Sequence, residues 1–192
     1  KIGVYLGIMK KIILLVGLIA HLSVFAAIDS KNIVSGKNLL SHKIVSVEAK
    51  GKKGLVVIFL SAKCPCSNSH IEELKSLSHD YPDFNFVGVH SNVDEPEDMA
   101  QTYFSKESLP FTVIQDDNAV LADQFQAFKT PHAFVIQSDG KILYQGGVSS
   151  SKTFAQADHK FLREALAHIQ LGQVVARPEG RTLGCSIARI LK

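Results

Sequence analysis

The sequence lacks several of the motifs on which enzyme chemistry commonly depends. Its 192 residues include three cysteines and no tryptophan, and we find no glycine-rich phosphate loop, paired carboxylate site, internal repeat or low-complexity segment. Glycine-rich loops bind nucleotide phosphates, and paired carboxylates serve as general acid and base. Their absence leaves the sulfur atoms of Cys64, Cys66 and Cys185 as the most informative side chains.

An excess of charge of one sign is also missing. The chain has 21 lysines and arginines against 18 acidic residues, but the whole surplus lies in residues 1–26. Without those residues the chain is formally neutral, so we expect no nucleic-acid partner. The remaining 166 residues are enough for one domain with a full-sized core.

An apolar run near the start of the chain predicts export. A basic start at residues 9–11, the run at residues 12–25 and a small-residue end at residues 24–26 are typical of a secretory signal peptide, residues 9–26. The run of about 14 residues is shorter than the ~20 that a spanning helix needs. We therefore expect a periplasmic or secreted protein, with membrane contact only if the leader is uncleaved. Exported cysteines meet an oxidising environment.

Two of the cysteines stand where a predicted strand turns into a predicted helix. Residues 55–60 are a continuous apolar run, typical of a strand that is buried on both faces. An apolar stripe over residues 71–77 then predicts an amphipathic helix. If this helix begins at the cysteines, Cys64 takes the N-cap place and Pro65 the first helical position.

This position favours the thiolate form of Cys64. Its sulfur would face unpaired backbone N–H groups and the positive end of the helix dipole, with Lys63 beside it. We therefore expect the pKa of Cys64 to lie below the ~8.5 of a free thiol. A thiolate attacks disulfides and peroxides, and it binds soft metals.

Downstream, predicted strands alternate with predicted helices. The strands are expected at residues 84–90, 111–114, 133–136 and 142–144, and the helices at residues 95–106, at residues 119–128 and along an apolar stripe from Phe154 to Ile169. A short edge strand is expected at residues 44–47. This order predicts an α/β fold with a mixed central β-sheet flanked by helices.

Three motifs give the chain a resemblance to the thioredoxin superfamily. They resemble the approach to the nucleophile, the cis-proline strand and the hairpin that follows it, at residues 59–64, 129–136 and 139–146. Residues 86–110 and a closing Gly-Cys-x-Ile element at residues 182–187 are similar to the exported redoxin and peroxiredoxin-like (AhpC-TSA-like) branch. The resemblance covers residues 54–170 and implies a thioredoxin-like fold.

The resemblance divides the chain into four parts. Residues 1–26 would be an upstream extension plus the signal peptide, and residues 27–53 an N-terminal extension. Residues 54–171 would form the thioredoxin-like (redoxin) domain, followed by a C-terminal tail at residues 172–192.

The chain departs from the thioredoxin pattern at three positions. Ser67 stands where that family has its second cysteine, Lys63 where it has tryptophan, and Ile58 where it has a buried acid that accepts a proton. The usual dithiol is therefore absent. The second sulfur is expected to be Cys66 or Cys185.

The two candidates for the second sulfur differ in geometry. Residues two apart do not face each other on a helix, so a bond between Cys64 and Cys66 would be strained and easily reduced. The tail that carries Cys185 could fold back, so that Cys185 resolves a sulfenic acid or a mixed disulfide. Alternatively, Cys185 could form a static bond that pins the tail.

The resemblance implies further site residues around the sulfurs. Pro131 would be the cis-proline, so that Thr130 before it faces an extended substrate. His132 would lie near the sulfurs, where an imidazolium would stabilise thiolate, and His70 could approach them as well. Ser61 resembles the hydroxyl with which a peroxiredoxin holds peroxide.

The leading interpretation is an exported thiol-disulfide oxidoreductase of redoxin type. Cys64 would attack a protein or small-molecule disulfide, and Cys66 or Cys185 would resolve the mixed disulfide. One alternative is a thiol peroxidase that reduces hydroperoxides. Another is a chaperone-like protein that holds Cu(I) with Cys64, Cys66 and His132 or His70. No cofactor is expected outside the Cu(I) alternative, and a degenerate fold kept for binding alone is the remaining interpretation.

Overall fold

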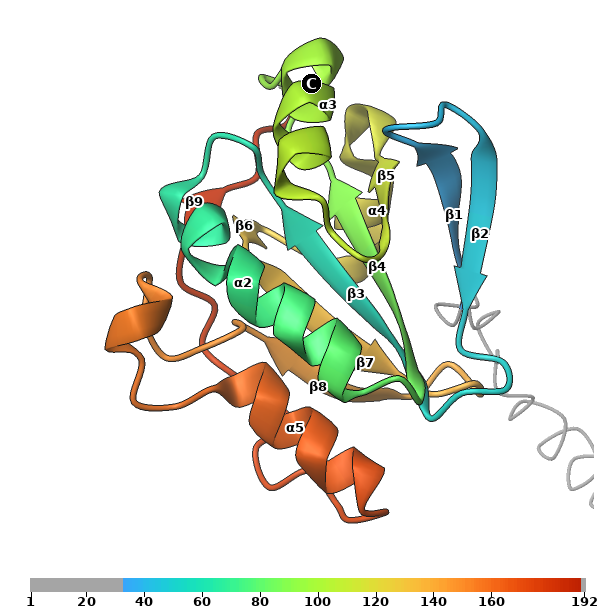
Figure 1. Cartoon of the computed structure of the whole chain (residues 1–192), viewed down its shortest axis with the longest axis vertical. Helices are drawn as coiled ribbons and strands as arrows, with labels where there is room; N and C mark the ends of the chain where they lie inside the picture. The colour runs from blue at the N-terminus through green and yellow to red at the C-terminus, as the bar shows by residue number, and fades with distance from the viewer. Residues whose placement is uncertain (1–32, 191–192) are drawn as a thin grey trace, which may run out of the picture.

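The computed structural model describes residues 33–190, in which helices cover both faces of a seven-stranded sheet and a separate two-stranded sheet lies beside it (Figure 1). In chain order the strands of the seven-stranded sheet are β1 (Ile33–Asn38), β2 (Ile44–Glu48), β3 (Gly54–Leu60), β4 (Phe84–His90), β5 (Thr112–Gln115), β7 (His132–Ile136) and β8 (Ile142–Gly146). The helices are α2 (Pro65–Asp80), α3 (Glu97–Glu107), α4 (Val120–Phe125) and α5 (Phe161–Gln170). The leader predicted at residues 9–26 lies outside the described residues.

The spatial order of the strands is β2-β1-β5-β4-β3-β7-β8. Strand β3 pairs parallel with β4 and antiparallel with β7, which makes the sheet mixed. All residues of β3 are buried, as the apolar run predicts, and its alternate side chains enter two separate hydrophobic cores. The predicted α/β thioredoxin-like fold is confirmed.

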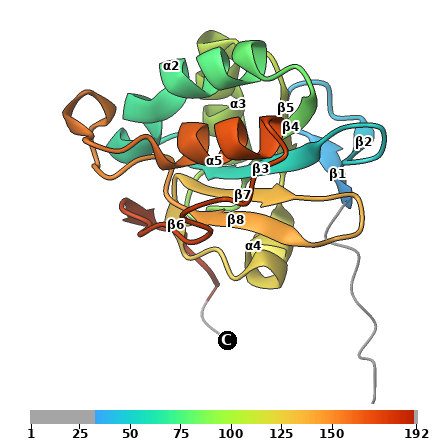
Figure 2. The ribbon, with the colours of Figure 1, turned by 90° about the horizontal axis from the view of Figure 1, so that it is seen from below.

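The helices divide between the two faces of the sheet (Figure 2). Leu74 of α2, Phe104 of α3 and Leu166 of α5 share one core, whereas Phe125 of α4 lies in the other. Each fully buried side chain of this size contributes about 1.5–3 kcal/mol through the hydrophobic effect. Packing of α2 on the sheet holds the first turn of that helix at the end of β3. Within residues 33–190, no helix has the length and hydropathy to span a membrane.

The sheet extends into the region predicted as an N-terminal extension. Strands β1 and β2 form an antiparallel hairpin, and Lys37 of β1 lies opposite Gln115 of β5. The edge position expected for residues 44–47 is confirmed by β2. Strand β1 was not predicted, because Ile33 and Val34 are followed by four small or polar residues.

Two helices predicted from the sequence have wrong boundaries. The helix expected at residues 119–128 is divided into a short 3-10 turn, Asp117–Ala119, and α4, which Gln126 ends with a left-handed φ of 54°. The closing helix does not reach back to Phe154. That residue lies in a separate 3-10 turn, Phe154–Gln156, and the chain is extended again before α5 begins.

The C-terminal tail returns along the sheet to the end that carries the cysteines. It first bonds the edge of β8, where the Gln145 N–H donates to the carbonyl of Pro178. Strand β9 (Cys185–Ser186) then pairs antiparallel with β6 (Lys129–Thr130), and the two lie side by side in Figure 1. Ile187 beyond β9 is buried in the same core as α4. The tail is therefore a docked part of the domain.

Candidate active site formed by three cysteines

Cys64 is the N-cap residue of α2, as the sequence predicts. Its backbone is extended, with φ −77° and ψ 115°, and Pro65 occupies the start of the helix, where a missing N–H costs no hydrogen bond. The backbone N–H of Cys64 donates to Ser61 Oγ at 3.0 Å. The side chain is only 2% exposed, so the sulfur is held in a fixed place against the protein interior.

Hydrogen bonds lower the pKa of the Cys64 thiol. Burial alone would raise it, but bonds from the Cys185 thiol and the backbone N–H groups of Ser67 and Cys185 help to outweigh burial. The pKa falls from 9.0 to about 7. Lys63, which was expected to favour the Cys64 thiolate, is not among the causes of the lowered pKa. Its ammonium instead donates to the carbonyl of Asp94.

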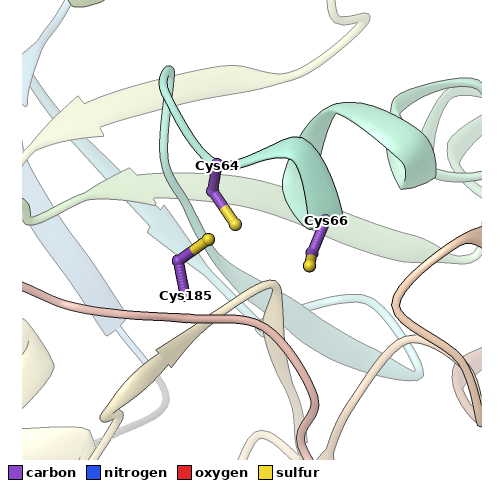
Figure 3. A group of neighbouring side chains, drawn as sticks. All are labelled: Cys64, Cys66 and Cys185. Atoms are coloured by element: carbon purple, nitrogen blue, oxygen red, sulfur yellow. The ribbon is translucent and has the colours of Figure 1, made fainter.

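Cys185 reaches Cys64 because β9 pairs with β6. Cys185 lies opposite Thr130, whose carbonyl oxygen accepts the Cys64 thiol at 3.3 Å. The peptide bond between Thr130 and Pro131 is cis, as the resemblance implies. Gly184 passes so close to Thr130 that an added Cβ would overlap the Thr130 carbonyl oxygen. Figure 3 shows the sulfurs of Cys64 and Cys185 pointing toward each other.

Cys66 completes a group of three free thiols. The sulfurs of Cys64, Cys66 and Cys185 all lie within 4.8 Å of one another. Burial, with the nearby charge of Cys64, raises the pKa of Cys66, and burial with hydrogen bonding to Cys64 raises the pKa of Cys185 to about 12. The first proton therefore leaves from Cys64, and the other two remain thiols at neutral pH.

Neither of the two histidines expected near the sulfurs brings a ring nitrogen into the sulfur group. Burial lowers the pKa of His132 to about 4, so its ring is neutral and provides no imidazolium. The ring nitrogens of His70 bond the carbonyl of Cys66 at 2.7 Å and Ser149 Oγ at 2.8 Å. Neither histidine joins the group of ligand atoms within 4.8 Å of one another.

A family model described as Redoxin matches residues 25–161, a stretch that includes the sheet, α2 and the cis-proline strand. The chain belongs to the redoxin family. A comparison with curated proteins found no match.

Solved structures similar to this redoxin support the fold. An uncharacterized conserved protein from Geobacillus kaustophilus has a TM-score of 0.75 at 21% identity, covering 85% of this chain and 92% of that chain. A secreted Mycobacterium tuberculosis disulfide oxidoreductase homologous to E. coli DsbE has a TM-score of 0.50 at 22% identity, covering 59% and 83%. The thioredoxin domain of a thiol-disulfide oxidoreductase from Bacteroides vulgatus has a TM-score of 0.51 at 20% identity, covering 59% of this chain and 82% of that chain.

The redoxin site contains a buried acid that sequence reasoning missed. Glu95 is 6% exposed, and its carboxylate accepts the Ser61 hydroxyl, the Ala62 N–H and the Asn92 side chain. His90 Nε2 lies 2.9 Å from the same carboxylate. Burial raises the pKa of Glu95, but the bonds from His90, Ser61 and Ala62 outweigh it and lower the pKa. The signal available was a histidine ending a buried strand, five residues before an acid.

Ser61 connects this acid to the cysteines. Its Oγ accepts the Cys64 N–H and donates to Glu95, so both functions of the hydroxyl are used within the protein. A chain of hydrogen bonds therefore runs from the N-cap of α2 through Ser61 to the carboxylate of Glu95. Glu95 thus provides a buried acid near the cysteines, although Ile58 stands where thioredoxin has its buried acid.

Proposed function

We propose that this redoxin is a thiol-disulfide oxidoreductase in which Cys64 is the nucleophile and Cys185 the resolving thiol. The observation that carries the proposal is the pairing of Cys185 with Thr130, which brings a sulfur of the tail against the N-cap of α2. The redoxin family, and the disulfide oxidoreductase and thiol-disulfide oxidoreductase named for two structural neighbours, are consistent with it.

The reaction begins with the Cys64 thiolate, the most acidic of the three thiols. It attacks one sulfur of a substrate disulfide, forming a mixed disulfide while the other substrate sulfur leaves as a thiolate. Cys185 then attacks the Cys64 sulfur, and its proton passes to the departing substrate thiolate or to water. The products are a reduced substrate and a disulfide between Cys64 and Cys185, which a thiol or dithiol donor must reduce.

Cys185 suits the resolving role better than Cys66. Figure 3 shows Cys185 directed at Cys64, while Cys66 stands to the side on the first turn of α2. A bond between residues two apart would distort that turn, whereas a bond from β9 joins two separate segments. We therefore assign Cys66 no part in the disulfide.

Disulfides are better candidates for the substrate than hydroperoxides. The peroxidase alternative assigns Ser61 to peroxide, but its hydroxyl is already used by Cys64 N–H and Glu95. Access to Cys64, which is 2% exposed beneath the tail, favours small or flexible disulfides over disulfides inside folded proteins. Export to an oxidising compartment, proposed from the leader at residues 9–26, would keep such substrates available.

One equivalent of the coloured aromatic disulfide dithiobisnitrobenzoate tests the proposal on the fully reduced chain. Attack by Cys64 releases one equivalent of coloured thiol, and resolution by Cys185 releases a second. We expect two equivalents from the wild type and from C66S, but one from C185S, which should retain the mixed disulfide. C64S should react slower by about 100-fold or more, since the reactive thiolate is lost.

The variants also define the contrary results. Two equivalents from C185S and one from C66S would give the resolving role to Cys66. Unchanged rates in C64S would remove Cys64 as the nucleophile. A rapid second-order reaction with hydrogen peroxide, far above that of a free thiol, would favour the peroxidase alternative.

A further inference from the structure

The three sulfurs lie close enough together to bind one metal ion, in addition to forming disulfides. They come from the N-cap of α2, the first turn of α2 and strand β9, and each pair lies within 4.8 Å (Figure 3). An ion at the centre of a triangle with 4.8 Å sides would be about 2.8 Å from each sulfur. Metal–thiolate bonds of about 2.3 Å would then need each sulfur to move inward by at most about half an ångström.

We propose that Cys64, Cys66 and Cys185 together bind one Cu(I) ion when the protein is reduced. Thiolates are soft ligands that select Cu(I), zinc or iron–sulfur clusters. Structural zinc is almost always four-coordinate. Among residues 33–190, no fourth histidine, cysteine or carboxylate joins this group, so three-coordinate Cu(I) fits the site better than zinc.

The surroundings favour the negative charge of such a complex. The N-terminal end of α2 points its unpaired N–H groups at the site, with Ser67 N–H bonding the Cys64 sulfur. The positive charge of Lys152 acts on Cys66. Cys64 and Cys66 are buried, which limits competition from water for the metal.

Cu(I) binding by the three cysteines and formation of a disulfide between any two of them exclude each other. Coordination replaces the proton of each thiol, the protons pass to solvent, and no electron is transferred. A disulfide between any two of the cysteines leaves one ligand. We therefore expect Cu(I) to bind only the reduced chain and to protect all three thiols from alkylation.

The test titrates the full-length, fully reduced chain with Cu(I) under anaerobic conditions, with bicinchoninate as the competing chelator. We expect one Cu(I) per chain, and X-ray absorption at the copper edge should show three sulfur neighbours. C64S, C66S and C185S should each weaken binding by at least about tenfold. S186A is the matched control, because Ser186 follows Cys185 in β9 with its side chain exposed, and it should bind as the wild type does.

Several results would overturn the proposal. Two sulfur neighbours in the wild type, or C185S binding Cu(I) as tightly as the wild type, would remove Cys185 from the site. Equal binding by the oxidised chain would show that the cysteine group is not the site. Zn(II) that displaces bound Cu(I) from the reduced wild type would contradict the three-coordinate assignment. The spectroscopy uses the wild type alone, so the outcome does not depend on the folding of any variant.

Discussion

Cys185 lies opposite Thr130 in the antiparallel pair of β9 and β6, while the Thr130 carbonyl accepts the Cys64 thiol at 3.3 Å. Thr130 therefore accepts a hydrogen bond from one cysteine of the proposed redox pair and pairs through its backbone with the other. The C-terminal tail supplies two of the hydrogen bonds that lower the pKa of Cys64. The state of Cys64 should thus depend on a segment more than a hundred residues away in the sequence.

The first prediction concerns the pH dependence of Cys64 reactivity. Since only the thiolate reacts, alkylation of Cys64 by iodoacetamide should rise with pH around a midpoint near the pKa of about 7. Cys185→Ala removes a thiol that donates to the Cys64 thiolate, so the midpoint of Cys64 alkylation in this variant should move to higher pH. Mass spectrometry of the modified peptide measures both profiles. An unchanged midpoint in C185A, with S186A as control, would show that the tail does not tune Cys64.

The second prediction concerns the close approach of Gly184 to Thr130. Gly184→Ala places a Cβ on the Thr130 carbonyl oxygen, so β9 must shift away from β6. We expect a loss of about 1–3 kcal/mol in unfolding free energy, as for other overpacked sites, and slower closure of the disulfide between Cys64 and Cys185.

The matched control for this substitution is Gly172→Ala. Gly172 also has a positive φ, of 69°, but an added Cβ there meets nothing within 4 Å. G172A should therefore close the disulfide at the wild-type rate. Equal closure rates in G184A and G172A would mean that the fit of Gly184 against Thr130 does not position Cys185.

The third prediction concerns Glu95. Glu95→Gln removes a buried carboxylate that accepts bonds from His90 and Ser61, and we expect a loss of about 1.5–3 kcal/mol at neutral pH. The pKa of Glu95 is lowered in the folded state from its ordinary 4.5. Its stabilisation is therefore complete above pH 4.5 and is lost as the pH falls through the folded pKa. Urea unfolding of wild type and E95Q between pH 3 and 7 measures the difference, and a constant difference would contradict this account.

The sequence predicts the parts of this fold that depend on local patterns. The apolar run of β3 and the N-cap at Cys64 with Pro65 behind it follow from neighbouring residues, whereas the cis-proline at Pro131 follows from the resemblance to the thioredoxin superfamily. The first two features place Cys64, the proposed nucleophile, at the start of a helix. The closing helix was less predictable, since the apolar Phe154 continues its stripe but lies in a separate turn.

The rest of the site depends on contacts between distant segments. The pairing of Cys185 with Thr130 spans 55 positions and involves strands of only two residues each, which leave no periodic pattern. The sequence predicts Glu95 as the first residue of a helix, and only the fold shows that its side chain is buried against Ser61. The resolving thiol could not be chosen between Cys66 and Cys185 from their spacing, because that choice also depends on a contact between distant segments.

The most direct measurement is mass mapping of all three cysteines in the full chain across a glutathione redox series. Each thiol is alkylated at equilibrium, and the disulfide-linked peptides are identified after digestion. We predict one dominant linkage, between Cys64 and Cys185, with Cys66 alkylated throughout. A dominant linkage that includes Cys66, or a Cys64 that remains a thiol while substrate is turned over, would contradict the proposed redox pair.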